Sequence, residues 1–166
     1  MIRHLLAFVL LAASVHAATL WYLPRLAMNT AMSRLETVGA TPNTIVHVPP
    51  TDETSRRVVR PSPDLLYSVC LLNLSDGPVQ LRAADWGGYM SLSLISGNTD
   101  NVAAINETQT DGDIILSVAD GAGADIDLGS TRGIAIIRRL VTNADALARA
   151  DAIRRQNDSC EAVEPT

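Results

Sequence analysis

The stretch RPSPDLLYSVCLLNLSDGP, residues 60–78, decides how the rest of the chain is interpreted. Pro61 and Pro63 hold the backbone extended and prevent a helix from forming at this point. Leu65–Leu74 is a nearly continuous apolar run, which is typical of a strand buried on both faces. Ser75–Pro78 combines serine, aspartate, glycine and proline, the residues that favour a turn. We therefore expect residues 65–74 to form the central strand of a β-rich domain.

Beyond this stretch, short apolar segments alternate with turns rich in glycine and aspartate. Val79–Ala83 follows its turn closely enough to return antiparallel to the central strand. Tyr89–Ser96 alternates between apolar and polar residues, which indicates a strand with one packed face. The remaining strand candidates share short length and β-branched content: Ile45–Val48 at an edge, Val102–Asn106, Ile114–Val118 and Ile134–Val141.

The last element has a helical pattern instead. Thr142 or Asn143 can cap its amino end, and Arg154 and Arg155 lie near its carboxyl end, where they suit the helix dipole. The tail, residues 158–166, should fray unless Cys160 is bonded. The expected fold is mainly β, an antiparallel sandwich or partly closed barrel, with a C-terminal helix and an N-terminal transmembrane helix.

The amino end carries the clearest signal for localisation. Leu5–Leu23 has no charge except a possible one on His16, and it is about long enough to cross a hydrocarbon core of ~30 Å. Trp21 and Tyr22 stand where an aromatic belt would lie. A competing interpretation is a signal peptide cleaved after Ala17. Both interpretations export the rest of the chain, and the length of the apolar run favours an uncleaved anchor over residues 1–24.

Residues 25–57 are expected to be a connector and linker between this anchor and the β-rich domain of residues 58–157. Arg25–Gly39 keeps helical spacing and is interpreted as a short amphipathic connector closed by Gly39. Thr41–Pro63 is rich in proline and threonine and is expected to be extended. Because a short amino-terminal stub before a single span usually stays inside, we expect the β-domain on the outer side of the membrane; the family resemblance described below implies a bacterial inner membrane and the periplasm.

Composition excludes several functions. The net charge of −5 argues against nucleic-acid binding, which needs a basic face. The chain has no lysine, so it cannot form a lysine Schiff base or a phosphate-binding loop ending in Gly-Lys. His47 is the only histidine beyond the apolar segment, so neither a multi-histidine metal site nor histidine-based catalysis is expected. We expect no cofactor and no metal, and we interpret the Asp-rich segment Asp111–Gly129 as turns in preference to a calcium site.

A few polar residues remain as candidate site residues. Asp64 lies at the mouth of the expected central strand, and Tyr67 lies within that strand. Asn98, Asp100 and Asn101 cluster after another strand and offer acceptors and amide donors, although a self-capped turn explains them as well. Asp64 and Asp100 could form an acid–base pair, but the sequence does not fix their separation. Cys70 and Cys160 could form one disulfide in an exported domain, or Cys70 could be a buried small hydrophobe.

These segments resemble the bacterial domain-of-unknown-function family numbered 1254. The quoted stretch carries its opening signature at Asp64, Tyr67, Leu74, Ser75 and Pro78, with Asn73 where the family usually has Asp and Ser62 where many members have Asn. GGYMSLSLISGNTDNVAAIN resembles the second block through Tyr89 and Asn101. STRGIAIIRRLVTNADALARADAIRRQ resembles the closing block through Arg138. The resemblance covers about residues 58–156 and is greatest to the short, membrane-anchored members.

The resemblance implies a mainly β domain that packs against a partner. Short members tend to be encoded beside a small protein of the family numbered 1214, and longer relatives fuse the two domains. We therefore expect an envelope binding or structural module whose candidate binding residues are Arg60, Asp64, Tyr67, Asn98, Asp100, Asn101 and Arg138. The alternative is an envelope hydrolase acting on a carbohydrate- or lipid-like substrate through Asp64 and Asp100.

Overall fold

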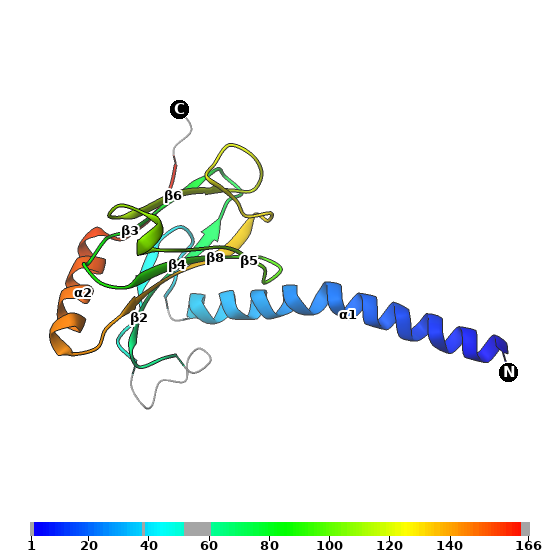
Figure 1. The fold of residues 1–166 in the computed structure, drawn as a ribbon. Helices are drawn as coiled ribbons and strands as arrows, with labels where there is room; N and C mark the ends of the chain where they lie inside the picture. The colour runs from blue at the N-terminus through cyan, green and yellow to red at the C-terminus, as the bar shows by residue number, and fades with distance from the viewer. Residues whose placement is uncertain (1, 38, 52–60, 164–166) are drawn as a thin grey trace.

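The computed structural model describes residues 2–37, 39–51 and 61–163. In chain order the elements are α1 (Ile2–Thr37), β1 (Ile45–His47), β2 (Leu65–Asn73), β3 (Val79–Ala83), β4 (Met90–Ser96), β5 (Asn101–Asn106), the 3-10 turn η1 (Glu107–Gln109), β6 (Ile114–Ala119), β7 (Ile126–Asp127), β8 (Arg132–Leu140), α2 (Ala144–Asn157) and β9 (Ser159–Ala162). The strands form two sheets, with the orders β1-β2-β8-β4-β5 and β7-β6-β3-β9. Figure 1 shows the two sheets together, with α2 beside them and α1 projecting away.

The two sheets share one apolar core. Along β2, Leu66, Cys70 and Leu72 face this core, and Val69 and Leu71 belong to a second cluster on the outer face of the five-stranded sheet. Strands that bury both faces read as continuous apolar runs, which is why the 65–74 segment shows no alternation. The predicted fold class is confirmed: the protein is mainly β, with a C-terminal helix and a long apolar N-terminal helix.

Two predictions about β2 were wrong. Val79–Ala83 does not return against it, because β3 crosses to the other sheet and pairs with β6 and β9. β2 instead pairs with β1 and β8, and β8 occupies the middle of the five-stranded sheet. Gly77, with a φ of 137°, allows the turn that redirects the chain between sheets. A turn signal marks the end of a strand but does not identify the strand's partner.

The C-terminal segment is part of the domain. Residues 159–162 form β9, which pairs antiparallel with β3. The sequence predicted that this segment frays unless Cys160 is bonded, and it did not predict a strand here. Cys160 lies in β9 and is bonded to Cys70 of β2, with an S–S distance of 1.99 Å. Both cysteines are buried, at 0% and 2% exposure. The disulfide therefore links the two sheets through the core.

α2 closes one side of the core. Asn143 is its N-cap, since the Asn143 side chain accepts a hydrogen bond from the Ala146 backbone N–H. Ala146 and Ala150 are buried against the sheets, and Leu147 and Ile153 pack beside them. Arg154 and Arg155 lie in the last turn, as expected from the sequence.

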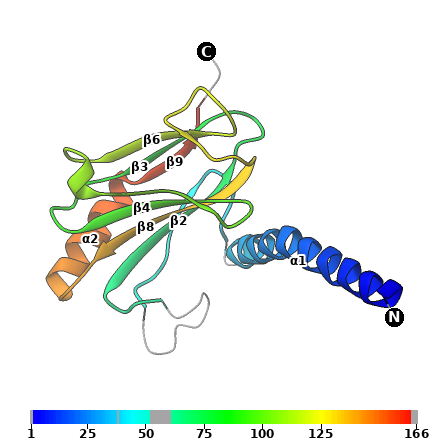
Figure 2. The ribbon, with the colours of Figure 1, turned by 45° about the vertical axis from the view of Figure 1, so that its right-hand side comes forward.

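α1 is one continuous helix rather than an anchor followed by a separate connector. Pro24 lies inside it, and the helix ends at Thr37. Gly39, at a φ of 95°, follows the helix as predicted, and its N–H bonds to the Glu36 carbonyl. Figure 2 shows α1 leaving the domain on the side opposite α2. The last turns of α1 therefore serve as the connection to the domain.

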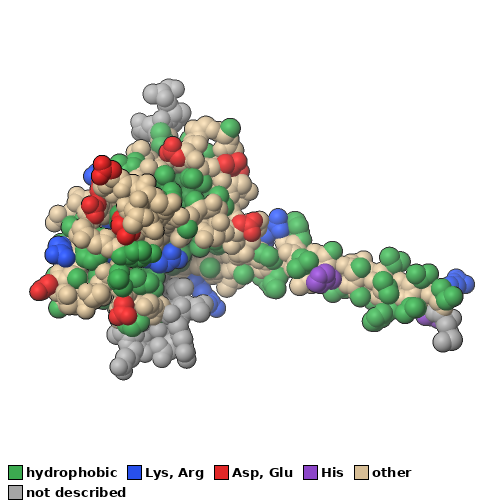
Figure 3. All heavy atoms as spheres, viewed as in Figure 1, with side chains coloured by type: hydrophobic (Ala, Val, Ile, Leu, Met, Phe, Trp, Pro, Cys, Tyr) green, Lys and Arg blue, Asp and Glu red, His purple; other side chains and the backbone are tan. Residues whose placement is uncertain are grey.

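The carboxyl end of α1 packs on the outer face of the five-stranded sheet. Met28 and Met32 are 4% and 2% exposed and form a cluster with Val69, Leu71 and Ile134. An ion pair of 3.5 Å between Glu36 Oε1 and Arg132 Nη2 links the last turn of α1 to the start of β8. The preceding part of α1 is exposed and mostly apolar, as Figure 3 shows. The helix and the domain are thus joined by packing as well as by the chain.

Candidate functional site

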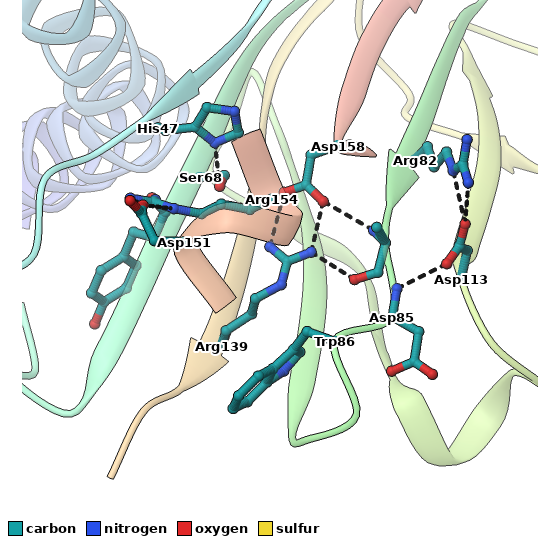
Figure 4. A network of polar contacts seen from close by, with 12 residues as sticks. His47, Ser68, Arg82, Asp85, Trp86, Asp113, Arg139, Asp151, Arg154 and Asp158 are labelled. Atoms are coloured by element: carbon teal, nitrogen blue, oxygen red, sulfur yellow. Dashed lines mark hydrogen bonds and ion pairs between the residues drawn. The ribbon is translucent and has the colours of Figure 1, made fainter. Parts of the chain in front are cut away.

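A buried ion pair lies under the carboxyl end of α2. Arg139 of β8 and Asp158 are almost fully buried, and the guanidinium binds the carboxylate through Nη1–Oδ2 at 2.8 Å and Nη2–Oδ1 at 2.6 Å. The pair also binds both backbone groups of Ala84: Arg139 donates to the Ala84 carbonyl, and the Ala84 N–H donates to Asp158. The pair therefore fastens the end of α2 to the segment that follows β3 (Figure 4).

A second arginine fastens α2 to the edge of the five-stranded sheet. Arg154 is fully buried and bonds to Asp151 one turn earlier in α2. Its Nη1 donates to the Tyr67 carbonyl at 2.5 Å, and its Nη2 donates to the Val48 carbonyl at 2.9 Å. Because Val48 follows β1 and Tyr67 lies in β2, this one side chain holds two neighbouring segments in place.

His47 lies beside this network, with its Nδ1 atom 3.0 Å from the Ser68 hydroxyl oxygen. Burial lowers the pKa of His47 below its usual 6.5, and the positive charge of Arg154 lowers it further. The sequence did not indicate this contact, because the two residues are 21 positions apart. Ser68 is fully buried, so a substrate in solution cannot reach its hydroxyl. The pair is therefore structural and does not form a nucleophile and base.

Asp64, Tyr67 and Arg138 lie at the end of the five-stranded sheet next to α2. Tyr67 and Arg138 are directly paired across β2 and β8. The Arg138 Nη1 atom donates to the Ser93 hydroxyl on β4 at 2.9 Å, and the Tyr67 hydroxyl accepts from the Ser62 backbone N–H at 3.1 Å. Arg60, the seventh candidate, lies outside the described residues.

Asn98, Asp100 and Asn101 lie at the opposite end of that sheet. Asn98 donates from its amide to Asp100 at 2.7 Å and accepts from the Ser96 hydroxyl. Asn101 begins β5, beside a bulge between Leu94 and Ile95 of β4. Within the turn, the Asn98 side chain and one carboxylate oxygen of Asp100 are therefore engaged in local hydrogen bonds, as in a self-capped turn.

This arrangement separates the two carboxylates considered for catalysis. Asp64 precedes Leu65, which pairs with Leu140, and Asp100 follows Ser96, which pairs with Gly133. The strand between these ends gives a separation of roughly 25 Å at ~3.3 Å per residue. Paired carboxylates that act on one glycosidic bond lie within about 10 Å. Asp64 and Asp100 therefore cannot act together as an acid and a base.

The end of the sheet next to α2 also exposes apolar side chains. Tyr89 is 45% exposed and Leu140 is 38% exposed, and the Leu140 N–H donates to the Tyr89 carbonyl. Together with the three candidates at this end they form a surface that we call the distal patch: Asp64, Tyr67, Tyr89, Arg138 and Leu140. It combines an aromatic ring, a carboxylate and a guanidinium, a composition found in protein interfaces.

An acidic depression of about 450 Å³ lies beside Tyr89 and is lined by Asp85, Glu107 and Asp111 among others. Within residues 2–37, 39–51 and 61–163, no three histidine, cysteine or acidic side chains gather as metal ligands.

In the Asp-rich segment, hydrogen bonds from the Ser117 N–H and hydroxyl lower the pKa of Asp125. Those from the Gly121 and Gly129 N–H groups lower the pKa of Asp127. These two carboxylates therefore stabilise their own loops.

Comparison with solved structures supports the same fold. The VPA0106 protein from Vibrio parahaemolyticus has a TM-score of 0.66 and 16% identity, and the match covers 88% of this chain and 37% of that one. An uncharacterized protein from Burkholderia cenocepacia has a TM-score of 0.52 and 16% identity, covering 90% of this chain and 44% of that one. At this identity the likeness concerns the fold alone. The chain spans less than half the length of either protein.

No curated protein matches the chain. A family model described as "Protein of unknown function (DUF1254)" matches residues 42–158. The match begins just before β1 and ends at Asp158, so it contains both sheets except β9 and includes the residues of the buried network. It extends further toward the amino end than the resemblance at about residue 58 indicated. Because the match covers more than half of the chain, the protein belongs to the DUF1254 family.

Proposed function

We propose that this protein is a membrane-anchored module of the bacterial cell envelope. α1 spans the inner membrane, and the β-domain lies in the periplasm, where its distal patch binds a partner domain. The observation that carries the proposal is the continuity of α1 with the domain. One helix presents an exposed apolar segment at its amino end and a packed segment at its carboxyl end.

The geometry of α1 supports an anchor over a cleaved signal. Leu5–Leu23 measures about 28 Å along a helix axis, close to the thickness of a hydrocarbon core. Only four residues separate Leu23 from Met28, the first residue of α1 buried against the sheet. Cleavage after Ala17 would leave Leu20, Trp21 and Leu23 exposed to water, each more than half exposed. A helix that remains whole places these side chains in lipid.

The disulfide supports export. A buried Cys70–Cys160 bond persists in oxidising compartments and is rare in the cytosol. Export with a short amino-terminal stub inside places the β-domain on the periplasmic side. On that side, the packing of Met28 and Met32 on the sheet holds the domain close to the membrane surface.

The distal patch is the surface proposed for the partner domain. It lies at the end of the five-stranded sheet next to α2, and α1 leaves the domain on the side opposite α2 (Figures 1 and 2). Tyr67 and Arg138 share the outer face of this sheet with Val69 and Ile136, which belong to the cluster that Met28 and Met32 contact. In both solved relatives this fold makes up less than half of a longer chain, so it occurs together with further structure. The resemblance to short family members makes a domain of the 1214 type the expected partner, encoded separately.

Binding to a separately produced 1214-type domain tests this proposal. Leu140→Arg places a charge in the distal patch, and it should weaken binding at least about tenfold, as substitutions at the centre of an interface do. The matched control is Ile115→Arg on β6, where the side chain is 52% exposed and belongs to the other sheet. That control should change binding less than about twofold. Equal binding by both variants and the unaltered protein would contradict the patch.

A further inference from the structure

We propose that α1 pairs in parallel with α1 of a second copy of this chain, through a helix face centred on His16. This inference rests on the anchor in the proposed function and adds a partner within the membrane. The observation behind it is the position of the polar side chain of His16 in the span. In an anchor over Leu5–Leu23, His16 lies about 3 Å from the midpoint of the span at 1.5 Å per residue.

A histidine at this depth needs a hydrogen-bond partner. Ser14 and Thr19, the two aliphatic hydroxyl side chains of the span, bond to the backbone of their own helix: Ser14 donates to the Leu10 carbonyl and Thr19 to the Val15 carbonyl, each at 2.8 Å. In the part of the chain that the structure describes, the exposed His16 ring has no such bond. Ionisable side chains within membrane helices face other protein groups, because an unpaired polar group in hydrocarbon is costly.

His16 lies at the centre of a heptad pattern. Starting from Val9, steps of four and three residues give Ala13, His16, Leu20, Leu23 and Ala27, the spacing of one face of a helix that packs against another helix. We call this set of residues the His16 seam. Ala13 is small and lets two backbones approach. A single polar residue in an otherwise apolar seam fixes the register of two helices.

The seam faces away from the β-domain. At 100° per residue, His16 lies about 120° around the helix from Met28 and about 160° from Met32. Met28 and Met32 are the residues that α1 buries against the five-stranded sheet. A second helix can therefore lie along the His16 seam without meeting the domain of the same chain. Figure 3 shows that the free part of α1 is exposed and largely apolar, with histidine interrupting it.

The hydrogen-bonding chemistry of imidazole indicates that the helix that packs on the His16 seam is α1 of a second copy of this chain. A neutral imidazole has one N–H donor and one nitrogen acceptor. Two His16 rings facing each other across a parallel pair can therefore supply the bond that each one needs. A symmetric pair brings equal residues to the same depth, as a two-fold axis along the membrane normal requires. No residue of a different protein is needed to satisfy this site.

Cysteine cross-linking in membranes tests the seam. The two native cysteines are joined to each other, so an introduced cysteine is the only free thiol of the full-length chain. Under a mild oxidant, Val9→Cys, Ala13→Cys and Leu20→Cys should give covalent dimers of this chain. Leu10→Cys and Ala17→Cys lie about 100–120° away from His16 around the helix and should give few.

Association of the full-length chain in lipid vesicles, followed by energy transfer between labelled copies, tests the role of His16. His16→Ala should weaken dimerisation by about 3- to 20-fold, the range of measured hydrogen bonds between membrane helices. His16→Asn should remain within about threefold of the native chain, because an amide also donates and accepts. Ser14→Ala, on the opposite side of the helix, is the matched control and should leave dimerisation unchanged.

Cross-links confined to the His16 seam would support the pairing if dimerisation is also weakened in His16→Ala but not in His16→Asn or Ser14→Ala. Equal cross-linking around the helix, unchanged association of His16→Ala, or seam cross-links only to a different protein would overturn it. Extraction of the chain from membranes by alkaline carbonate would overturn the anchor itself. A chain that is retained in the membrane but monomeric would overturn only the pairing, so the two failures are distinguishable.

Discussion

Replacing Cys70 and Cys160 together by alanine should lower the free energy of unfolding by about 4–5 kcal/mol. The bond joins residues 90 positions apart. The loop-entropy relation for a closed loop of this length gives about 4.6 kcal/mol at 25 °C. Native proteins typically have a total stability on the order of 5–15 kcal/mol. The loss is therefore a large fraction of the total, because the loop that the bond closes is long.

Urea unfolding of the full-length chain in detergent micelles measures this loss. Trp86 is 6% exposed, so its fluorescence reports the opening of the core, and the double variant should unfold at a much lower urea concentration than the native chain. A thiol count of the denatured, unreduced native chain is the control and should give none. A loss below about 1 kcal/mol at an unchanged urea dependence would refute the loop-entropy argument. Two free thiols per native chain would refute the bond itself.

Three further predictions concern the network around α2. Asp158→Ala should cost about 3–5 kcal/mol in urea unfolding, because it leaves the Arg139 guanidinium buried without its carboxylate; a cost below 1 kcal/mol would contradict the pair's role. Asn143→Ala should cost about 1 kcal/mol by removing the N-cap bond to Ala146, and it should increase amide exchange in the first turn of α2. Burial lowers the pKa of His47 below 6.5 in the folded state, so as the pH falls the unfolded chain is protonated at this imidazole before the folded chain is. The contribution of His47 to the free energy of unfolding is therefore present above about pH 6.5 and decreases as the pH drops below that value. In His47→Asn, the urea midpoint should therefore change less with pH between pH 7.5 and 5.5 than in the native chain. An equal change with pH in both chains would show that other titratable groups control the pH dependence of stability.

The sequence predicted local structure well where the pattern of residues was itself local. The apolar run at Leu65–Leu74 is a buried strand, Asn143 caps α2, and Ile45–Val48 contains an edge strand. Each of these depends on the character of a few consecutive residues. The partners of the strands depend on the whole chain, which is why β3 was assigned to the wrong neighbour and β9 was not predicted as a strand.

The buried polar network was missed for the same reason. Arg139 follows Ala135 and Ile137 at intervals of two, and this alternation places it on the core face of β8. That signal was available, since an arginine in a core position requires a buried partner. Its partner Asp158 is 19 residues away, beyond α2, and no local pattern connects the two. Of the candidate residues, the structure brings Asp64, Tyr67 and Arg138 to one end of the sheet and the Asn98–Asn101 group to the other.

The mass of the mature protein, purified from washed bacterial membranes, tests the anchor most directly. An uncleaved α1 predicts a chain that retains residues 2–17 and stays in the membrane after alkaline carbonate treatment. Its β-domain should be open to protease only from the periplasmic side. A chain that begins at Ala18 and appears in the soluble periplasmic fraction would contradict the anchor, and with it the membrane-held module and the pairing through His16.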